Sequence, residues 1–550
     1  MFMSVFKGFL EQAVNAFRNK PAVFRVLVLA GAILLTYGNS LLNGFVWDDR
    51  DIIVNNVVNR DSANFRSLFM SADTTVLGDQ KSYYRPLNRL TYMLDYQMFG
   101  LRPAWYHLEN VIIHLMTVIL LYFVAIRLFA EPVPAFIAAL IFAVHPVNAE
   151  AINFISARNS LLSAFFVLLT LITYLHAETR NRKPYYYLSG LFFLMGLLCK
   201  EQAMMLPVVL FVFEMTRDRA DTTGTRARIL PMLPFVLATA IYLVLRTYAL
   251  SSILGGHRIV DGLWERLLQN IYIIPKYAIV VLFPLRLSAL YSLPQNYLGE
   301  AAWLVPLWVV ISAVFLVLDK KRAATKFGLL WLAINFIPIS NIVPIPSAPM
   351  AERYLYLPAI GLWIIAADQA YALYERHAFK KTLLACGAAV MICLAVITVN
   401  RNGVWKDNIT FYTHMVKMNP DSALAHFSLG LANWERNEIP LAQSEWKRTA
   451  EIDPRYFNVL AFLGQSYVRS NSFEQAEYYY TREVEEYPDD ATAIYNLALL
   501  KEKLNKPHEA LRYYEQFIKV QPQPDMTLLA KVNIRIALLK IVKGKKHGSE

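Results

Sequence analysis

Two adjacent carboxylates lie near the start of the polar loop that follows the first apolar run. Asp48 and Asp49 lie in the segment FVWDDRD (45–51), directly after an apolar run at 24–42. Acidic groups at the mouth of a membrane helix are costly to desolvate, and neighbouring carboxylates repel each other. A carboxylate within hydrogen-bond reach of a hydroxyl can accept its proton. We therefore expect a functional role for the pair, with a solvated cap at the helix end as the alternative.

Several basic residues fall on the side of the membrane that the order of spans makes non-cytoplasmic. They are Arg85, Arg89, Arg158, Lys200 and Arg353. Arginine offers forked donors and lysine a point charge, so a lipid phosphate or pyrophosphate at the outer surface would satisfy them. The alternative is that they pair with neighbouring carboxylates, since Lys200 precedes Glu201 and Arg353 follows Glu352.

Histidines occur at the same expected level. His107, Asn110 and His114 share one face of the second apolar run, and His107 is the better site candidate because it lies nearer the outer surface. His145 and Glu150 end the third run, but without an HExxH or paired-cysteine spacing we expect no metal site. Walker, GxSxG and GxGxxG motifs do not occur, so neither a nucleotide nor another cofactor is expected.

The composition indicates a membrane protein with several spans. Of 550 residues, 56% are hydrophobic and 17% charged, whereas a soluble domain carries about a quarter charged residues. Of the net charge of +12, +11 comes from the first 400 residues. Such an excess is typical of cytoplasmic loops near anionic lipid, and we expect membrane lipid rather than nucleic acid as the partner.

Eleven apolar runs are predicted to cross the membrane. They lie at 24–42, 106–128, 132–148, 159–177, 185–199, 202–216, 229–249, 301–318, 326–341, 354–373 and 382–399. The first is too long for a signal-peptide core, so we expect a retained helix. Basic clusters after alternate spans predict a cytoplasmic N-terminus and an outer C-terminus, provided that 267–285, which Pro275 and Lys276 interrupt, does not cross completely.

A repeat array follows the spans. Pro420, Pro454, Pro488 and Pro522 are spaced by 34 residues, as are the leucines at 429, 463 and 497, the alanines at 442, 476 and 510, and the aromatic residues Trp446, Tyr480 and Tyr514. This period is typical of tetratricopeptide repeats. We expect a membrane domain at 1–400 with its first outer loop at 43–104, and a repeat domain at 401–550. The repeats are predicted near 423–456, 457–490 and 491–524, with a capping helix at 525–542.

Six segments together resemble one family. They are FVWDDRDIIVNN (45–56), YYRPLNRLTYMLDYQMFG (83–100), YHLENVIIHL (106–115), HPVNAEAINFISARNSLL (145–162), LCKEQAMMLP (198–207) and AERYLYLPAIG (351–361). In this order they resemble the transmembrane and tetratricopeptide-repeat O-mannosyltransferases and their bacterial relatives. The resemblance covers nearly the whole chain, although about three repeats are fewer than the animal members carry.

The resemblance implies an all-α fold, a C-type glycosyltransferase helical bundle followed by a tetratricopeptide-repeat solenoid. It also implies a polyprenyl-phosphate sugar as donor and an acidic pair in the first outer loop. Carried over, Asp48 would be the general base and Asp49 would orient acceptor or base. The sidedness of the cations adds candidates for holding the donor phosphate: Arg85, Arg158, Lys200, Arg353 and, beside them, His107.

The preferred hypothesis is a glycosyltransferase that inverts the anomeric carbon in a single displacement, with a protein Ser/Thr hydroxyl as acceptor and the repeats holding the acceptor protein or a partner. Two alternatives stay open. One is a non-enzymatic scaffold or a translocator of lipid-linked glycans, and the other a transferase with a lipid or polysaccharide acceptor. We expect a bacterial inner membrane with periplasmic repeats, the endoplasmic reticulum with lumenal repeats being the alternative.

Overall fold

A computed structural model describes residues 21–71, 83–129, 131–180, 182–216, 230–250, 262–294, 296–342, 348–456, 458–521 and 526–547. The chain divides into two compact units, Met1–Asp407 and Asn408–Glu550, close to the domain boundary expected at 400. Within the described ranges the β-type pairing is confined to an isolated bridge between Tyr291 and Met350. The predicted all-α architecture is confirmed.

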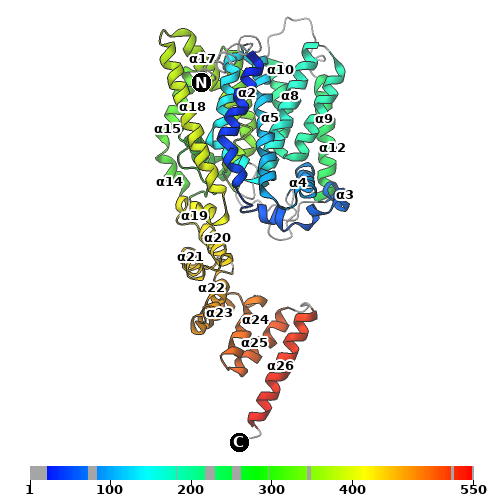
Figure 1. Ribbon diagram of the computed structural model, residues 1–550, viewed down its shortest axis with the longest axis vertical. Helices are drawn as coiled ribbons and strands as arrows, with labels where there is room; N and C mark the ends of the chain where they lie inside the picture. The colour runs from blue at the N-terminus through cyan, green and yellow to red at the C-terminus, as the bar shows by residue number, and fades with distance from the viewer. Residues whose placement is uncertain are drawn as a thin grey trace, which may run out of the picture. The chain divides into compact units, whose positions relative to one another are not determined.

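The first unit is a bundle of helices (Figure 1). Its helices are α2 Pro21–Tyr37, α3 Phe65–Met70, α4 Pro86–Phe99, α5 Pro103–Phe129, α6 Pro132–Val144, α7 Ala149–Asn153, α8 Arg158–Arg180, α9 Lys183–Cys199, α10 Leu206–Thr216, α12 Leu233–Leu250, α13 Leu263–Leu282, α14 Tyr297–Ala302, α15 Val305–Val317, α16 Ala323–Phe336, α17 Ala359–Arg376 and α18 Lys380–Asn402. Helix α5 packs against α6 and α8, and α8 against α9.

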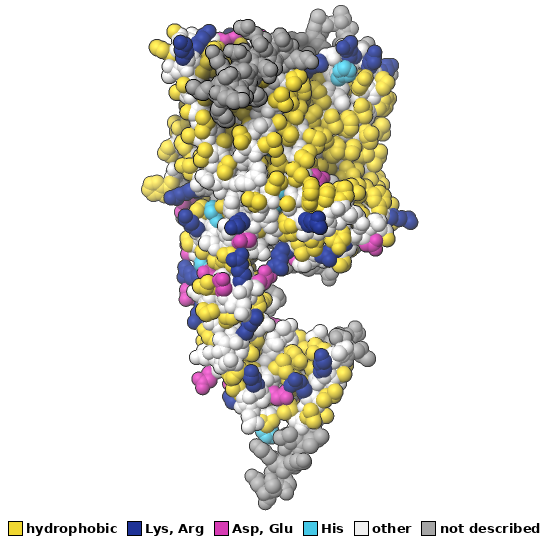
Figure 2. Space-filling model, viewed as in Figure 1, with side chains coloured by type: hydrophobic (Ala, Val, Ile, Leu, Met, Phe, Trp, Pro, Cys, Tyr) yellow, Lys and Arg dark blue, Asp and Glu magenta, His cyan; other side chains and the backbone are white. Residues whose placement is uncertain are grey.

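Each of the eleven predicted apolar runs overlaps at least one helix of this bundle, and 301–318 overlaps both α14 and α15. Five of the described helices are long and apolar enough to cross a membrane, or six if the bent pair Pro132–Val144 and Pro146–Asn153 forms one span. Helix α13 is not among them, and neither are α9, α10, α15, α16 and α17, which overlap runs predicted to cross. The eleven crossings and the incomplete crossing of 267–285 therefore stay predictions. Figure 2 shows hydrophobic side chains over the middle of the bundle and basic ones at both ends, as membrane immersion requires. The protein is an integral membrane protein.

Helices α16 and α17 approach each other closely through two glycines. A Cβ atom added at Gly361 would lie 2.5 Å from the backbone oxygen of Gly328. Small residues of this kind allow membrane helices to pack backbone against backbone. The pairing holds the start of α17 in place, and the short helical turn Glu352–Tyr354 just before it contributes to the site below.

The second unit consists of helix pairs. Its helices are α19 Asn408–Met418, α20 Ala423–Glu435, α21 Ile439–Ile452, α22 Val459–Arg469, α23 Phe473–Glu486, α24 Ala491–Lys503, α25 Pro507–Val520 and α26 Met526–His547. Each predicted repeat therefore holds one pair, and α26 follows where a capping helix is expected. One further helix, α19, precedes the first predicted repeat. The 34-residue period did not predict it, because α19 corresponds to the second helix of a repeat whose first helix is absent.

Within a repeat, a small residue on the first helix makes room for an aromatic ring on the second. A Cβ atom at Gly464 would lie 2.8 Å from the ring of Tyr480. The alanine of the 34-residue register is fully buried in each repeat, at Ala442, Ala476 and Ala510. The period seen in the sequence is thus the packing contact between the paired helices.

Candidate functional site

The acidic pair lies in the loop that follows α2, and its two members have different surroundings. Asp49 is completely buried, and its Oδ1 accepts hydrogen bonds from the backbone N–H of Ser156 at 2.7 Å and from the Ser156 hydroxyl at 2.6 Å. Its Oδ2 accepts from the N–H of Val46 at 3.3 Å. Asp48 remains partly exposed. Asp49 therefore anchors the loop, and Asp48 is the carboxylate of the pair that is accessible from outside.

Trp47, directly before the pair, adopts an unusual backbone conformation. Its φ of 55° lies in the left-handed region, which a bulky residue rarely enters. The indole ring stacks on Phe154, with ring centroids 5.1 Å apart and an angle of 16° between the planes. Strain of this kind persists where surrounding contacts enforce it, often at functional sites. Here it turns the loop directly before Asp48.

Burial raises the pKa of both carboxyl groups. The pKa of Asp48 rises to about 6, because burial outweighs the attraction of Arg353. Burial also raises the pKa of Asp49, to about 7, against the hydrogen bonds from Ser156 that favour the ionised form. A base with a pKa near 6 is ionised at neutral pH and still accepts a proton readily.

Arg353 lies close enough to Asp48 for its charge to act on that carboxyl group. Its guanidinium pairs with Glu150, and its backbone N–H donates to the same carboxylate at 3.0 Å. The guanidinium carbon lies 5.6 Å from the ring centroid of Trp47 and 5.7 Å from that of Phe154. Its charge lowers the pKa of Asp48, and the carboxylates of Glu150 and Asp48 in turn raise the pKa of Arg353 against the effect of burial.

Lys200 links Arg353 to the next cation. It follows α9, its Nζ donates to the Ser160 hydroxyl at 2.8 Å, and it lies 5.4 Å from the ring centroid of Tyr354. Burial, followed by repulsion from Arg85 and Arg353, lowers the pKa of Lys200 to about 7. The three cations therefore share one electrostatic environment, and an anion entering it would hold Lys200 in its charged form.

Arg85 shares a carboxylate with a cation that the sequence reasoning missed. Its Nη2 and Nε donate to Oε2 of Glu201 at 3.0 and 3.3 Å. Arg246 of α12 donates to Oε1 of Glu201 at 3.3 Å and also lies 3.3 Å from the Tyr242 hydroxyl. The signal that could have found Arg246 is a charged residue inside an apolar run, which by default indicates a functional site.

The donor-phosphate role predicted for Arg158 does not fit its position. Its side chain is fully buried between α4, α5 and α8, and its guanidinium is bound on all sides. The partners are Asp95 at 2.6 Å, Asn110 at 2.7 Å, Glu109 at 2.9 Å, Thr91 at 3.0 Å and the Tyr106 carbonyl at 3.1 Å. We therefore assign Arg158 to the scaffold of the outer loop.

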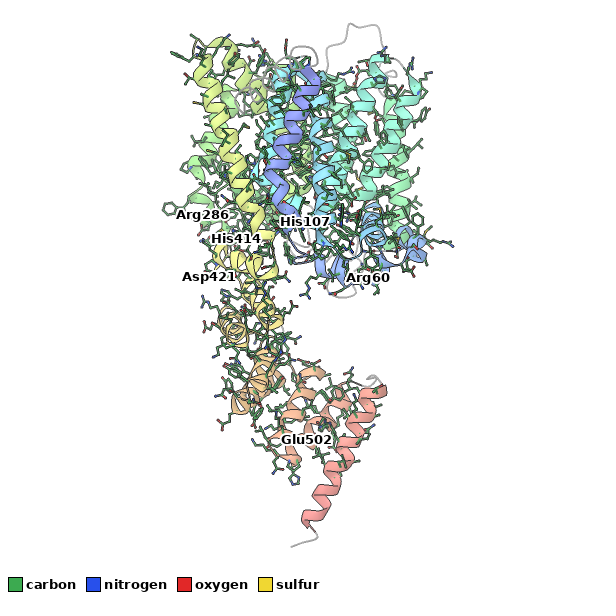
Figure 3. All side chains as sticks on the ribbon, viewed as in Figure 1. Arg60, His107, Arg286, His414, Asp421 and Glu502 are labelled. Carbon is green, nitrogen blue, oxygen red and sulfur yellow. The ribbon has the colours of Figure 1, made fainter. Side chains whose placement is uncertain are left out.

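His107 also supports the loop rather than the cation group. It is fully buried, and its Nε2 lies 3.3 Å from the carbonyl oxygen of Gly44. The N–H of Gly44 donates to the carbonyl of Lys406 at 2.9 Å, which fixes the start of the loop from a second side. Figure 3 shows His107 at the end of the bundle where α3 and α4 lie. The predicted phosphate-binding role does not fit this contact.

The cations do not pair with their sequence neighbours. Arg353 pairs with Glu150, while Glu352 accepts from the Ser288 N–H and the Tyr291 hydroxyl, both at 2.7 Å, and faces Arg401 at 3.4 Å. Glu201 binds arginines rather than Lys200.

The two residues considered for zinc are engaged separately. Glu150 binds Arg353, and Nε2 of His145 lies 3.1 Å from the Val281 carbonyl oxygen. Among the described residues no cluster of three or more His, Cys, Asp and Glu side chains has the arrangement of a metal site.

Two family descriptions match the chain. "Dolichyl-phosphate-mannose-protein mannosyltransferase" matches residues 94–250, and "Tetratricopeptide repeat" matches residues 491–524, which are the third predicted repeat.

Curated relatives match almost the full sequence. The human protein O-mannosyl-transferase TMTC3 is 25% identical over 94% of this chain and 63% of its own length. The human protein O-mannosyl-transferase TMTC1 is 25% identical over 80% of this chain and 56% of its own length. The chain thus spans less than two thirds of the length of these relatives.

Solved structures also align with the chain. An oligosaccharyltransferase of Archaeoglobus fulgidus aligns over 70% of this chain and 56% of its own, with 11% identity and a TM-score of 0.42. ArnT of Cupriavidus metallidurans, bound to undecaprenyl phosphate, aligns over 82% of this chain and 78% of its own, with 15% identity and a TM-score of 0.37. It is the curated relatives that confirm the resemblance indicated by the six segments: this chain is similar to the transmembrane and tetratricopeptide-repeat O-mannosyltransferases over nearly its whole length.

Proposed function

We propose that this protein is a membrane glycosyltransferase that moves a sugar from a polyprenyl-phosphate donor to an acceptor hydroxyl on the non-cytoplasmic side. The observation that carries the proposal is the position of Arg353 near the ring of Trp47 and close to the Asp48 carboxyl group, with Lys200 and Arg85 extending the group of cations. One carboxylate near a group of cations suits a reaction in which a proton leaves the acceptor and negative charge builds on a departing phosphate.

In this reaction Asp48 takes the proton of the acceptor hydroxyl as its oxygen attacks the anomeric carbon. The bond from that carbon to the donor phosphate breaks in the same step, so the configuration inverts. The bond electrons pass to the phosphate oxygen, where Arg85, Lys200 and Arg353 stabilise the charge. Asp49, held by Ser156, keeps Asp48 in position.

The relatives are named protein O-mannosyl-transferases, which favours mannose as the sugar and a protein Ser/Thr hydroxyl as the acceptor. We assign the repeats of the second unit to holding the acceptor protein or a partner, because stacked helix pairs offer an extended binding surface. The positive-inside bias supports an N-terminus in the cytoplasm and repeats on the opposite side of the membrane. We assign the protein to a bacterial inner membrane with periplasmic repeats, the endoplasmic reticulum with lumenal repeats being the alternative.

The test is transfer from radiolabelled polyprenyl-phosphate mannose to a Ser/Thr-rich peptide by the purified chain. The rate with Asp48→Asn should fall by about 10²–10⁴-fold, the usual contribution of a positioned base. Asp61→Asn is the matched control, because Asp61 caps an exposed turn of the same loop through the N–H of Ala63. A rate for Asp48→Asn equal to that of the control would remove Asp48 as the base.

A further inference from the structure

Glu201 is held by two arginines from different parts of the chain. Arg85 precedes α4 and binds one carboxylate oxygen, while Arg246 comes from α12 and binds the other. Two guanidinium groups that converge on one oxyanion form the arrangement with which arginines bind a phosphate. The carboxylate of Glu201 therefore occupies a position that a phosphate group would fit.

This ion pair is also the most accessible one at the site. Side-chain exposure is 18% for Arg85, 30% for Glu201 and 12% for Arg246. In the neighbouring pair of Arg353 with Glu150 the values are 10% and 0%. A buried pair cannot lose a member without leaving an uncompensated charge, whereas an accessible pair can exchange its anion with one from outside.

Positive charge exceeds negative charge around this carboxylate. Lys200 adjoins Glu201 in the chain, and its charge interacts with those of Arg85 and Glu201. Although burial opposes it, attraction from Arg85 and Arg246 lowers the pKa of Glu201 to about 2, so this side chain is an anion at any physiological pH. A ligand that enters the site must therefore compete with a permanent internal anion.

We propose that Glu201 is an exchangeable counter-anion whose carboxylate is displaced from Arg85 and Arg246 by the phosphate of the lipid donor. This inference rests on the proposed function, and it adds Arg246 as a phosphate-binding residue. After transfer, the lipid phosphate carries more negative charge than the donor and binds the arginines more strongly. The return of the Glu201 carboxylate then helps to release it, so Glu201 sets both donor affinity and product release.

The experiment measures binding of farnesyl phosphate to the purified full chain in detergent, with farnesol and inorganic phosphate as separate arms. Glu201→Gln removes the competing charge and keeps the size of the side chain. Its affinity for farnesyl phosphate should rise about fivefold, the factor expected for losing a partly exposed ion pair, while farnesol binding stays unchanged. Arg246→Gln should bind farnesyl phosphate about tenfold more weakly, because a charged donor to the phosphate is lost.

The matched control is Asp319→Asn, which breaks another accessible ion pair of the same unit, with Arg376 at 2.9 Å, and should leave affinity unchanged. Equal or weaker binding by a folded Glu201→Gln overturns the proposal. If that variant fails to fold, Glu201→Asp takes its place. The shorter aspartate side chain reaches Arg85 and Arg246 less well, so affinity for farnesyl phosphate should also rise. Equal affinity of inorganic and farnesyl phosphate for Glu201→Gln would also overturn the assignment to a lipid phosphate.

The kinetics separate this inference from the proposed function. Glu201→Gln should lower both KM for the lipid donor and kcat, because the product phosphate leaves slowly, whereas a merely structural role would raise KM. If Asp48→Asn retains full transfer, the proposed mechanism fails, but the binding comparison still decides the role of Glu201. If transfer depends on Asp48 while Glu201→Gln binds more weakly, only the exchange of Glu201 is wrong.

Discussion

Ser156 binds the Asp49 carboxylate twice, through its backbone N–H at 2.7 Å and its hydroxyl at 2.6 Å. The two residues lie 107 positions apart in the sequence, so this contact joins the first outer loop to the start of α8. A buried carboxylate needs such donors to stay ionised or well ordered. Because of this contact, Asp49 anchors the loop, and Asp48 is left as the candidate base.

Removing the Ser156 hydroxyl should destabilise the protein and slow transfer. Ser156→Ala leaves only the backbone N–H groups of Ser156 and Val46 as donors to the buried carboxylate, and we expect the free energy of unfolding to fall by about 1–3 kcal/mol. Thermal unfolding in detergent and kcat/KM for transfer measure the two effects. The control is Ser163→Ala in α8, which begins directly after the turn that holds Ser156, because the buried hydroxyl of Ser163 has no hydrogen-bond partner. Identical behaviour of the two variants would contradict an anchoring role for Ser156.

The acid limb of the pH profile should report Asp48. A base with a pKa of about 6 is protonated below that pH, so log kcat/KM should rise with pH up to about 6. Arg353 lowers this pKa by attraction, so Arg353→Gln should move the limb to higher pH, and Arg353→Lys should move it less. The measurement is the dependence of kcat/KM on pH, between about pH 5 and 9, for the wild type, Arg353→Gln and Arg353→Lys. If the acid limb of Arg353→Gln stays in place or moves to lower pH, Arg353 does not lower the pKa of Asp48.

Lys200 should limit donor binding at high pH. Its pKa is lowered to about 7, so its charge is lost as the pH rises through that value. KM for the lipid donor should therefore increase above about pH 7 in the wild type. Lys200→Arg stays charged and should keep KM flat to higher pH. A rise in KM that persists unchanged in Lys200→Arg would mean that another group titrates.

The repeat unit should lose stability as the pH rises. Glu483 is buried, and burial, followed by repulsion from Asp490, raises its pKa to about 7. Because the folded state binds the proton more tightly than the unfolded one, the stabilisation is complete below about pH 4.5 and is lost as the pH rises through 7. Glu483→Gln should remove this dependence of the unfolding temperature on pH. Glu485→Gln, at an exposed neighbouring position, is the control and should keep it.

Local sequence patterns predict most of the fold. The 34-residue period locates the helix pairs because it is imposed by contacts between the two helices of a repeat, such as Gly464 against Tyr480. The 34-residue period did not predict helix α19, because the first helix of its repeat is absent. Only Tyr412 matches the position of the recurring aromatic residues. Apolar runs locate the helices of the bundle, but not which short turns, such as Glu352–Tyr354, bring charged residues together.

The candidate site is only partly predictable because counter-ions come from distant parts of the chain. Sidedness finds Arg85, Lys200 and Arg353 as a group. It also selects Arg158, whose partners Asp95 and Glu109 neutralise it in the interior, and the sequence offers no sign of that pairing. Arg246 was missed because its apolar surroundings mark a span and hide a contact to Glu201, 45 residues away.

The most direct test of the proposed mechanism is an experimental structure of the full chain with undecaprenyl phosphate bound. The proposed mechanism predicts density for the phosphate within hydrogen-bond reach, about 3 Å, of at least two of the side chains of Arg85, Arg246, Lys200 and Arg353, with Asp48 facing the same site. A phosphate bound away from all four cations, or an Asp48 carboxylate directed into bulk solvent, would contradict the central claim that base and donor site share one pocket.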